Sequence, residues 1–153
     1  MRLHPLLLVV AVLAVSPGCK RKPTYSDSQG PELAQSEIDR LYGEGQDKYD
    51  AGDFASASET WVRILDNTRE VRPRKATREM LLLSVLQADI DAYNRTPLGD
   101  GTKNVEYLRS AKKALDTYTT LYHRAYGELA ALGPAVLEKS AELDKLLAAA
   151  EGG

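Results

Sequence analysis

The 153-residue chain has one cysteine, two histidines, one tryptophan and one phenylalanine. A single cysteine cannot close an internal disulfide or build a cysteine cage for a metal, so stability has to come from packing. The histidines, His4 and His123, lack the sequence companions of a histidine metal site or a Ser-His or Cys-His nucleophile pair. No G-x-G-x-x-G or G-x-x-x-x-G-K-[ST] phosphate loop is present either. These absences predict a protein that is not an enzyme and holds no metal or dissociable cofactor.

The chain also lacks a surplus of basic residues. It has 20 Lys and Arg against 22 Asp and Glu, for a formal net charge of −2. Binding to nucleic acid requires a strong basic surplus to neutralise phosphates, so no nucleic-acid partner is expected. With 43% apolar and 27% charged residues, the chain has the composition of a globular protein, and its length suits one domain with a core.

Residues 1–18 have the pattern of an export signal. Arg2 and His4 precede ten uninterrupted apolar residues, Leu6 to Val15, and the pair Pro17-Gly18 then leads to Cys19. A positive segment, a hydrophobic segment and a small-residue exit are what a secretion channel engages and releases. The apolar run is too short to span a bilayer, which needs about twenty apolar residues. We therefore expect residues 1–18 to be removed.

The Gly18-Cys19 pair after this apolar run resembles a bacterial lipoprotein signal, although Ser16-Pro17 stands where that family usually has a leucine and a small residue. The resemblance implies a diacylglycerol on the Cys19 thiol, cleavage just before Cys19, and an N-acyl chain such as palmitate on the new amino terminus. An ordinary secretory cut fits less well because no A-x-A site is present. A buried Cys19 thiol fits less well because Lys20-Arg21-Lys22 would be buried with it. The implied location is a membrane, the outer membrane facing the periplasm, with the protein held by its lipid anchor.

Residues 19–35 are expected to form a flexible tether. The stretch PTYSDSQGPELAQ, from Pro23 to Gln35, has two prolines, three Ser or Thr and few large apolar residues. Fully extended, such a tether reaches at most roughly 55 Å. The folded domain is therefore expected to start at Ser36, to end near residue 150, and to sit off the membrane.

Residues 36–150 carry helical periodicity almost throughout, which predicts an all-α domain of about five helices in antiparallel hairpins. The first helix is expected from the cap Ser36 to Ala51, and the second from Phe54 to Asn67. A third, from residue 74 or 77 to Asn94, is apolar around much of its circumference and is expected to be the central buried helix. Thr102 is the expected cap of the fourth helix. The fifth follows Gly133-Pro134, and no strand is predicted.

Two acidic residues of the third helix, Asp89 and Asp91, do not form a plausible acid and base pair. Residues two apart on a helix point in divergent directions. We expect both to be solvated flanks of the central helix. The lone His123, between Tyr122 and Arg124, is expected to be a satisfied or exposed side chain.

The stretch LYGEGQDKYDAGDFASASETWVRIL, Leu41 to Leu65, resembles a tetratricopeptide repeat, a 34-residue helix-turn-helix unit. The positions of the repeat that match are these: a small residue at Gly45, an aromatic at Tyr49, the turn Gly52-Asp53-Phe54, an alanine at Ala57 and an aromatic at Trp61. The departures are Ile64 in place of alanine and Arg69 in place of the closing proline. A second repeat in the third and fourth helices is much less marked. The resemblance implies a compact tetratricopeptide-like domain.

The resemblance also implies which residues face a ligand. In the repeat family the ligand-facing positions of the first helix correspond to Asp39, Tyr42, Gln46, Tyr49 and Asp50. A groove lined by tyrosine, amide and carboxylate groups suits peptide binding, because aromatics supply contact area and polar groups fix register. The alternative is that the third helix covers Tyr42 and Tyr49, which would then act only as core.

A second group of candidate partner-binding residues is basic and surrounds Pro73. Cations at a helix start oppose the helix dipole, so helix propensity alone does not explain them. They can meet an acidic partner or anionic lipid, and the alternative is a merely solvated loop. The residues concerned are Arg69, Arg72, Arg74, Lys75 and Arg78.

These observations lead to one functional expectation. The protein is expected to be a lipid-anchored cell-envelope protein whose helical domain binds another envelope protein or a peptide, as an interaction or scaffolding module. Two alternatives remain open at this point. One is an envelope enzyme or small-ligand-binding lipoprotein, and the other is a passive spacer.

Overall fold

The computed structural model describes residues 33–67 and 75–152. The export signal, Cys19, most of the expected tether and the arginines at 69, 72 and 74 lie outside these residues. The helices are α1 (Gln35–Asp50), α2 (Phe54–Asp66), α3 (Lys75–Arg95), α4 (Glu106–Tyr126) and α5 (Pro134–Glu151). The described residues contain no strand, only an isolated bridge between Pro97 and Lys103. The predicted all-α class is confirmed.

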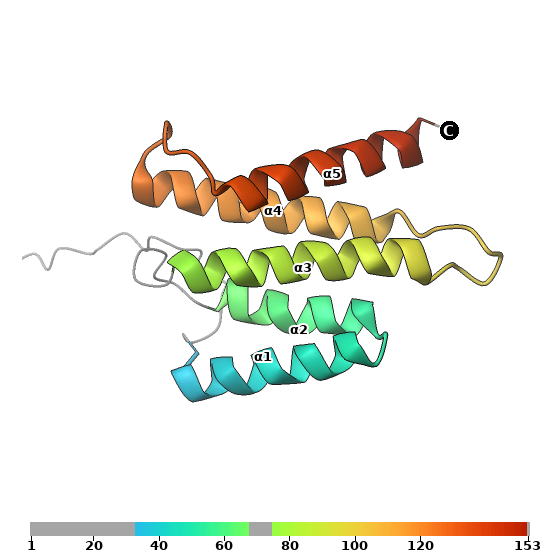
Figure 1. Ribbon diagram of the computed structural model, residues 1–153, viewed down its shortest axis with the longest axis horizontal. Coiled ribbons are helices and arrows are strands. Elements are labelled where there is room, and N and C mark those ends of the chain that lie inside the picture. Colours follow the sequence, from blue (N-terminus) through green and yellow to red (C-terminus); the bar gives the residue numbers. More distant parts are fainter. Residues whose placement is uncertain (1–32, 68–74, 153) are drawn as a thin grey trace, which may run out of the picture.

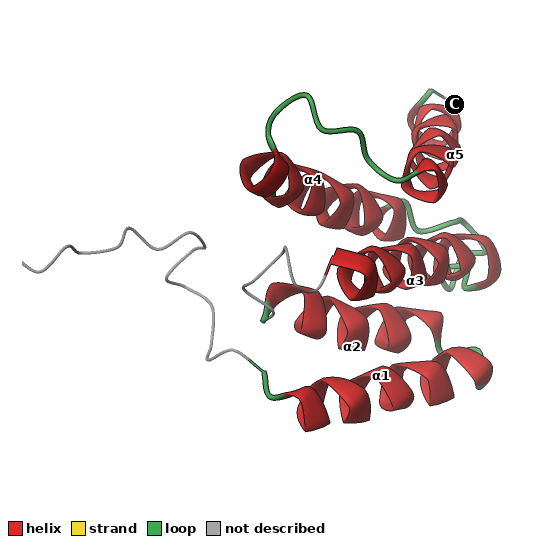
Figure 2. Cartoon of the chain, turned by 60° about the vertical axis from the view of Figure 1, so that its left-hand side comes forward, coloured by secondary structure: helices red, strands yellow, loops and turns green. Residues whose placement is uncertain are grey.

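The helices stack in chain order, each against its neighbour. Figure 1 shows α1 at the bottom and α5 at the top, with α3 in the middle layer. α5 also contacts α3, so the last helix closes over the middle of the stack. Figure 2 shows α5 nearly end-on while α4 runs across the view, so α5 crosses α4 at a marked angle. None of the described helices is long and apolar enough to cross a membrane.

The central position of α3 is confirmed by its burial. Side chains all around this 21-residue helix are shielded from solvent. Helices pack on several sides of α3, and only a stripe from Met80 to Gln87 in its central part is exposed or partly buried. Its buried residues are Arg78, Leu81, Leu82, Val85, Leu86, Ala88, Asp89, Ile90, Asp91, Ala92 and Tyr93.

The α1–α2 hairpin depends on a close approach between Gly45 and Trp61. A Cβ atom at Gly45 would lie only 2.7 Å from the indole Cδ1 and Cε2 atoms, so any side chain there would collide with the ring. Trp61 is buried, and its Nε1 donates a hydrogen bond to the Tyr42 carbonyl at 3.2 Å. The turn between the helices has Gly52 at φ 82°, and the Asp53 carboxylate caps α2 by accepting from the Ser56 amide. Gly45 therefore sets the spacing of this hairpin.

The α3–α4 connection corrects the predicted cap of the fourth helix. α4 begins at Glu106, four residues after Thr102. The Thr102 amide and hydroxyl both donate to the Asp100 carboxylate, at 2.9 and 2.7 Å, so Thr102 is part of the turn. The Asn104 side chain instead accepts from the Glu106 amide at 3.1 Å. Proximity to Asp100 outweighed the intrinsic capping preference of threonine.

α5 rests on two buried side chains and on ion pairs with α4. Pro134 begins the helix, where its missing N–H costs nothing. Val136 and Leu143 are fully buried beneath α5. On the surface, Arg109 of α4 pairs with Glu151 at 3.0 Å and Lys112 of α4 pairs with Asp144 at 3.2 Å. Exposed pairs of this kind contribute little, so the apolar contacts dominate.

Candidate binding groove

A groove of about 540 Å³ crosses the side of the stack where α1, α3 and α5 meet. We call it the α1–α3–α5 groove. Its lining comes from all three of these helices and from Trp61 of α2. The lining residues are Gln46, Tyr49, Trp61, Met80, Leu83, Ser84, Gln87, Ala135, Glu138, Lys139 and Glu142.

The groove has an apolar strip with polar groups on either side of it. Met80 is 48% exposed, an unusual exposure for a large apolar side chain on the central helix of the stack. Leu83, one turn further along α3, is partly buried against the core. Glu138 of α5 is exposed and has no hydrogen bond or ion pair among the described residues. The groove therefore offers a partner an apolar contact and an unneutralised carboxylate.

A chain of hydrogen bonds joins the three helices beside the groove. The Tyr49 hydroxyl of α1 donates to Asp91 Oδ2 of α3 at 2.5 Å, and Gln87 Nε2 donates to the same oxygen at 3.0 Å. Lys139 Nζ of α5 then donates to Gln87 Oε1 at 2.8 Å and to Glu142 Oε2 at 2.7 Å. Burial, followed by the hydrogen bond to Asp91, raises the pKa of Tyr49 to about 12, so its phenol is protonated at neutral pH. These hydrogen bonds fix the positions of α1, α3 and α5 relative to one another along the groove.

The expectation that Asp91 is solvated is wrong. Asp91 is only 7% exposed. Besides Tyr49 and Gln87, it has an ion pair with Arg95 at 3.7 Å. A buried carboxylate is tolerated only when it is paired and hydrogen-bonded, and the donors from α1 and α3 meet that requirement.

Asp89 is also buried, at 2% exposure, which corrects the same expectation on the other side of α3. Its partners are the side chains of Ser58 on α2 and Ser110 on α4. Burial raises the pKa of Asp89 to about 6, because two hydroxyl donors offset only part of the cost of removing the charge from water. Its Oδ2 atom has no hydrogen-bond partner among the described residues.

Two of the five ligand-facing positions predicted on α1, Gln46 and Tyr49, line the groove. Tyr42 does not line it, but packs partly buried beside Trp61 with ring centroids 6.2 Å apart. Asp39 and Asp50 are exposed and accept hydrogen bonds from glutamines of their own helix, Gln35 and Gln46. α3 covers Tyr49 in part through its bond to Asp91, so Tyr49 serves both core and groove.

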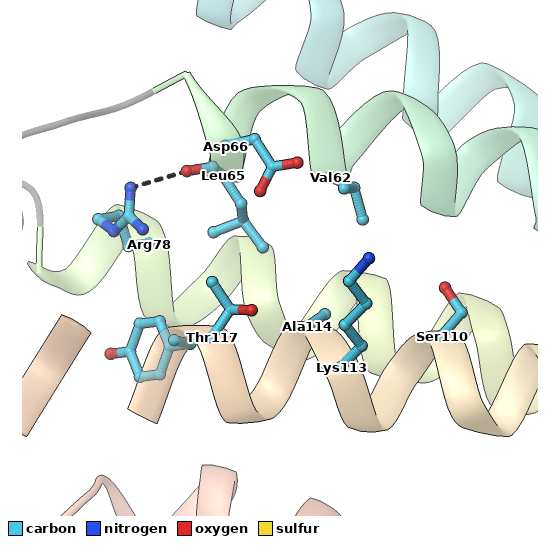
Figure 3. Close-up of a pocket in the computed structure, with 9 residues that line it drawn as sticks. Val62, Leu65, Asp66, Arg78, Ser110, Lys113, Ala114 and Thr117 are labelled. Carbon is cyan, nitrogen blue, oxygen red and sulfur yellow. Dashed lines mark hydrogen bonds between the residues drawn. The ribbon is translucent and has the colours of Figure 1, made fainter. Parts of the chain in front are cut away.

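The structure separates Arg78 from the other candidate basic residues. Arg78 is 2% exposed and donates from Nη1 to the Leu65 carbonyl at the end of α2, at 3.0 Å (Figure 3). The expectation that it meets a partner at the surface is wrong, because it lies on the side of α3 that packs against α2. Arg72 and Arg74 lie outside the described residues, as does the side chain of Lys75.

The groove residues of α3 and α5 escaped sequence analysis. Gln87, Lys139 and Glu142 have no local motif, and their roles appear only when three helices are placed side by side. His123 is partly buried, with Nε2 3.2 Å from the Ala130 carbonyl, as expected for a satisfied side chain. Within residues 33–67 and 75–152, no three His, Cys, Asp or Glu side chains come together to hold a metal ion.

Comparison with known proteins finds no matching family, no similar curated protein and no similar solved structure.

Proposed function

We propose that this chain is a lipid-anchored protein of the bacterial cell envelope whose helical domain binds a peptide segment of a partner protein in the α1–α3–α5 groove. The observation that carries the proposal is the groove itself, which three helices line and which exposes Met80. The Cys19 pattern supports the anchor. The close fit of Gly45 against Trp61 supports a tetratricopeptide-like first hairpin.

The charges of the groove favour a segment with basic and apolar side chains. Lys139 is the only basic residue of the lining, and Gln87 and Glu142 already occupy its ammonium group. Glu138 offers a free carboxylate beside the apolar strip. Asp50 is exposed and accepts a hydrogen bond from the groove residue Gln46, so it adds negative charge beside the groove. Complementary charge then sets the register of the segment while the apolar contact supplies most of the affinity.

The binding proposal is tested by selecting peptides from a random displayed library on the folded domain and measuring their affinity by titration. We expect selected peptides to combine Lys or Arg with large apolar residues. Met80→Asp should weaken their binding about tenfold or more, because it places a charge on the apolar strip. The matched control is Leu137→Asp, since Leu137 is 52% exposed on α5 and does not line the groove.

The charge argument has its own pair of variants. Glu138→Gln should weaken basic peptides by roughly two- to fivefold, and this loss should shrink as salt is added. Glu128→Gln changes an exposed carboxylate of the α4–α5 loop outside the groove and should leave affinity unchanged. Equal binding to wild type and Met80→Asp, or a library that enriches nothing, would rule out peptide binding in the groove.

The lipid anchor is tested separately by metabolic labelling of the full chain with a radioactive fatty acid. Label should be incorporated into the wild-type chain and lost in Cys19→Ala. The substitution Ser28→Ala, in the expected tether, is the control and should be labelled like wild type. Equal labelling of Cys19→Ala and wild type would rule out a lipid anchor on Cys19.

A further inference from the structure

A second, smaller cavity lies between α2 and α4, with α3 behind it (Figure 3). It has a volume of about 170 Å³ and shares no lining residue with the α1–α3–α5 groove. We call it the α2–α4 pocket. Its lining residues are Val62, Leu65, Asp66, Arg78, Ser110, Lys113, Ala114, Thr117 and Tyr118.

One wall of the α2–α4 pocket has a buried hydroxyl group with nothing to bond. Tyr118 is 3% exposed, and its hydroxyl has no hydrogen-bond partner among the described residues. Burial raises the pKa of Tyr118 to about 12, so the hydroxyl keeps its proton as a potential donor. A buried polar group without a partner destabilises the folded state.

Besides Arg78, which donates to the Leu65 carbonyl, the pocket is lined by two opposite charges that form no ion pair with each other. Asp66 is half-buried at the end of α2, and burial raises the pKa of its carboxyl group. Lys113 extends from α4 toward α2 (Figure 3). Neither side chain has a hydrogen bond or an ion pair within 4.0 Å among the described residues. The charges of Lys113 and Arg78 act on Asp66 without direct contact, so the pocket presents an anion and a cation that are not joined in an ion pair.

The remaining walls favour a small ligand with an apolar body. Val62, Leu65 and Ala114 supply aliphatic surface. A cavity of about 150 Å³ is known to hold a molecule the size of benzene, so the α2–α4 pocket can take a ligand of a few to ten heavy atoms. A ligand with one charge would leave either Asp66 or Lys113 unpaired at the pocket.

We propose that the α2–α4 pocket binds a small zwitterion the size of a free amino acid. The ligand's ammonium group lies against the Asp66 carboxylate, and its carboxylate accepts from Lys113 Nζ. The aliphatic wall contacts the ligand's side chain. This site is independent of peptide binding, because none of its residues lines the groove.

The experiment is a titration of the folded domain with three related compounds, followed by two-dimensional amide NMR. L-valine has both charges and a branched side chain that suits the aliphatic wall. L-valinamide lacks the carboxylate, and isovalerate lacks the ammonium group. We expect saturable shifts at pocket amides with L-valine, and affinities at least about fivefold weaker for the other two compounds.

Variants locate each contact. Asp66→Asn should weaken L-valine binding at least about fivefold while leaving isovalerate binding unchanged, and Lys113→Gln should do the same with L-valinamide as the unaffected compound. Lys112→Gln is the matched control, since Lys112 already pairs with Asp144.

Several results would overturn the site. These are an absence of saturable shifts with L-valine up to about 10 mM, equal affinity for the three compounds, and unchanged L-valine binding in both Asp66→Asn and Lys113→Gln. The amide spectrum of each variant reports its folding in the same experiment. A peptide that binds the groove should leave L-valine affinity unchanged, so failure of one proposal is distinguishable from failure of the other.

Discussion

Asp89 and Asp91 are two residues apart on α3, both are buried, and their surroundings differ sharply. Asp91 faces α1 and is held by Tyr49, Gln87 and Arg95. Asp89 lies between α2 and α4, with Ser58 and Ser110 as partners and one oxygen atom unpaired. The buried carboxylate on the α1 side of the central helix is therefore stabilised by several donors, while the carboxylate on the α2 and α4 side is only partly hydrogen-bonded.

The difference shows that the two sides of α3 satisfy their buried polar groups to different degrees. On the α1 side, polar groups connect helices in an unbroken chain that ends at Glu142 on α5. On the α2 and α4 side, the Tyr118 hydroxyl and Asp89 Oδ2 are buried without partners. A fully hydrogen-bonded network holds the helices in one arrangement. Polar groups without partners can instead be stabilised by binding a ligand or a proton. The following predictions test this contrast, beginning with the largest effect.

Trp61→Ala should destabilise the domain by about 3–5 kcal/mol in urea unfolding followed by far-ultraviolet circular dichroism. The indole packs at the α1 side, beside Tyr49 with ring centroids 5.9 Å apart, and the space opposite Gly45 cannot close without it. Leu137→Ala, at a half-exposed position, should cost less than about 0.5 kcal/mol. A loss below about 1 kcal/mol for Trp61→Ala would show that the indole contributes no core packing.

Asp89→Asn should raise stability by about 1–3 kcal/mol near pH 8 and have little effect near pH 4. The pKa of Asp89 is about 6 in the folded state, above the ordinary value of 3.8. The folded state therefore binds the proton more tightly, and wild-type stability falls as pH rises from about 4 to about 6. The asparagine removes that loss because it carries no charge.

The measurement is urea unfolding of wild type and Asp89→Asn across that pH range. Asp116→Asn is the control, since Asp116 is exposed on the surface of α4. A constant stability difference between Asp89→Asn and wild type at every pH would mean that folding does not raise the pKa of Asp89.

Tyr49→Phe should destabilise the domain by about 1–2 kcal/mol near pH 7, because it removes a hydrogen bond to the buried Asp91 carboxylate. Tyr42→Phe is the control. Tyr42 is a partly buried tyrosine on the same helix, and its hydroxyl makes no hydrogen bond with the described residues. If both variants lose equal stability, Asp91 does not depend on the donor from α1.

Lys139→Met should cost about 0.5–1 kcal/mol, since it keeps the aliphatic stem and removes the donor to Gln87 and Glu142. Lys145→Met, at an exposed position of α5, should be within about 0.3 kcal/mol of wild type. Chemical denaturation measures both. Equal stability of the two variants would show that the hydrogen bonds of Lys139 contribute nothing to stability and that apolar contacts alone hold α5 against α3.

Much of the fold follows from local sequence pattern. The apolar spacing of residues 81–93 predicts a helix buried on several sides, and α3 is that helix. Gly45 and Trp61 stand out in the sequence through its resemblance to a tetratricopeptide repeat, which has a small residue and an aromatic residue at these positions. Such features are local, or are limited to one hairpin, so one chain is enough to find them.

The burial of Arg78, Asp89 and Asp91 could not be predicted in this way. Their polarity predicts exposed positions, and the hydrogen-bonding partners that stabilise them when buried are distant in the sequence. Tyr49 is 42 residues from Asp91, and Ser58 and Ser110 lie on different helices. The same reason explains why Gln46 and Tyr49 were identified in the groove while Lys139 was missed. The repeat pattern predicts which residues of α1 face a ligand. The α5 residues that line the groove depend on how the last helix crosses the stack, which no local pattern shows.

Gly45 has a consequence for how this protein can change over evolutionary time. Most positions of a helix accept alanine, and glycine in a helix interior is itself less favourable by roughly 0.5–1 kcal/mol. At position 45 a glycine-to-alanine substitution cannot give this stabilisation, because the added methyl group collides with the indole of Trp61. Relief requires a smaller residue at 61, which loses the core, or a wider α1–α2 angle, which moves Tyr49 away from Asp91. Positions 45, 61, 49 and 91 can therefore drift only together, and descendants of this sequence should keep or replace them as a set.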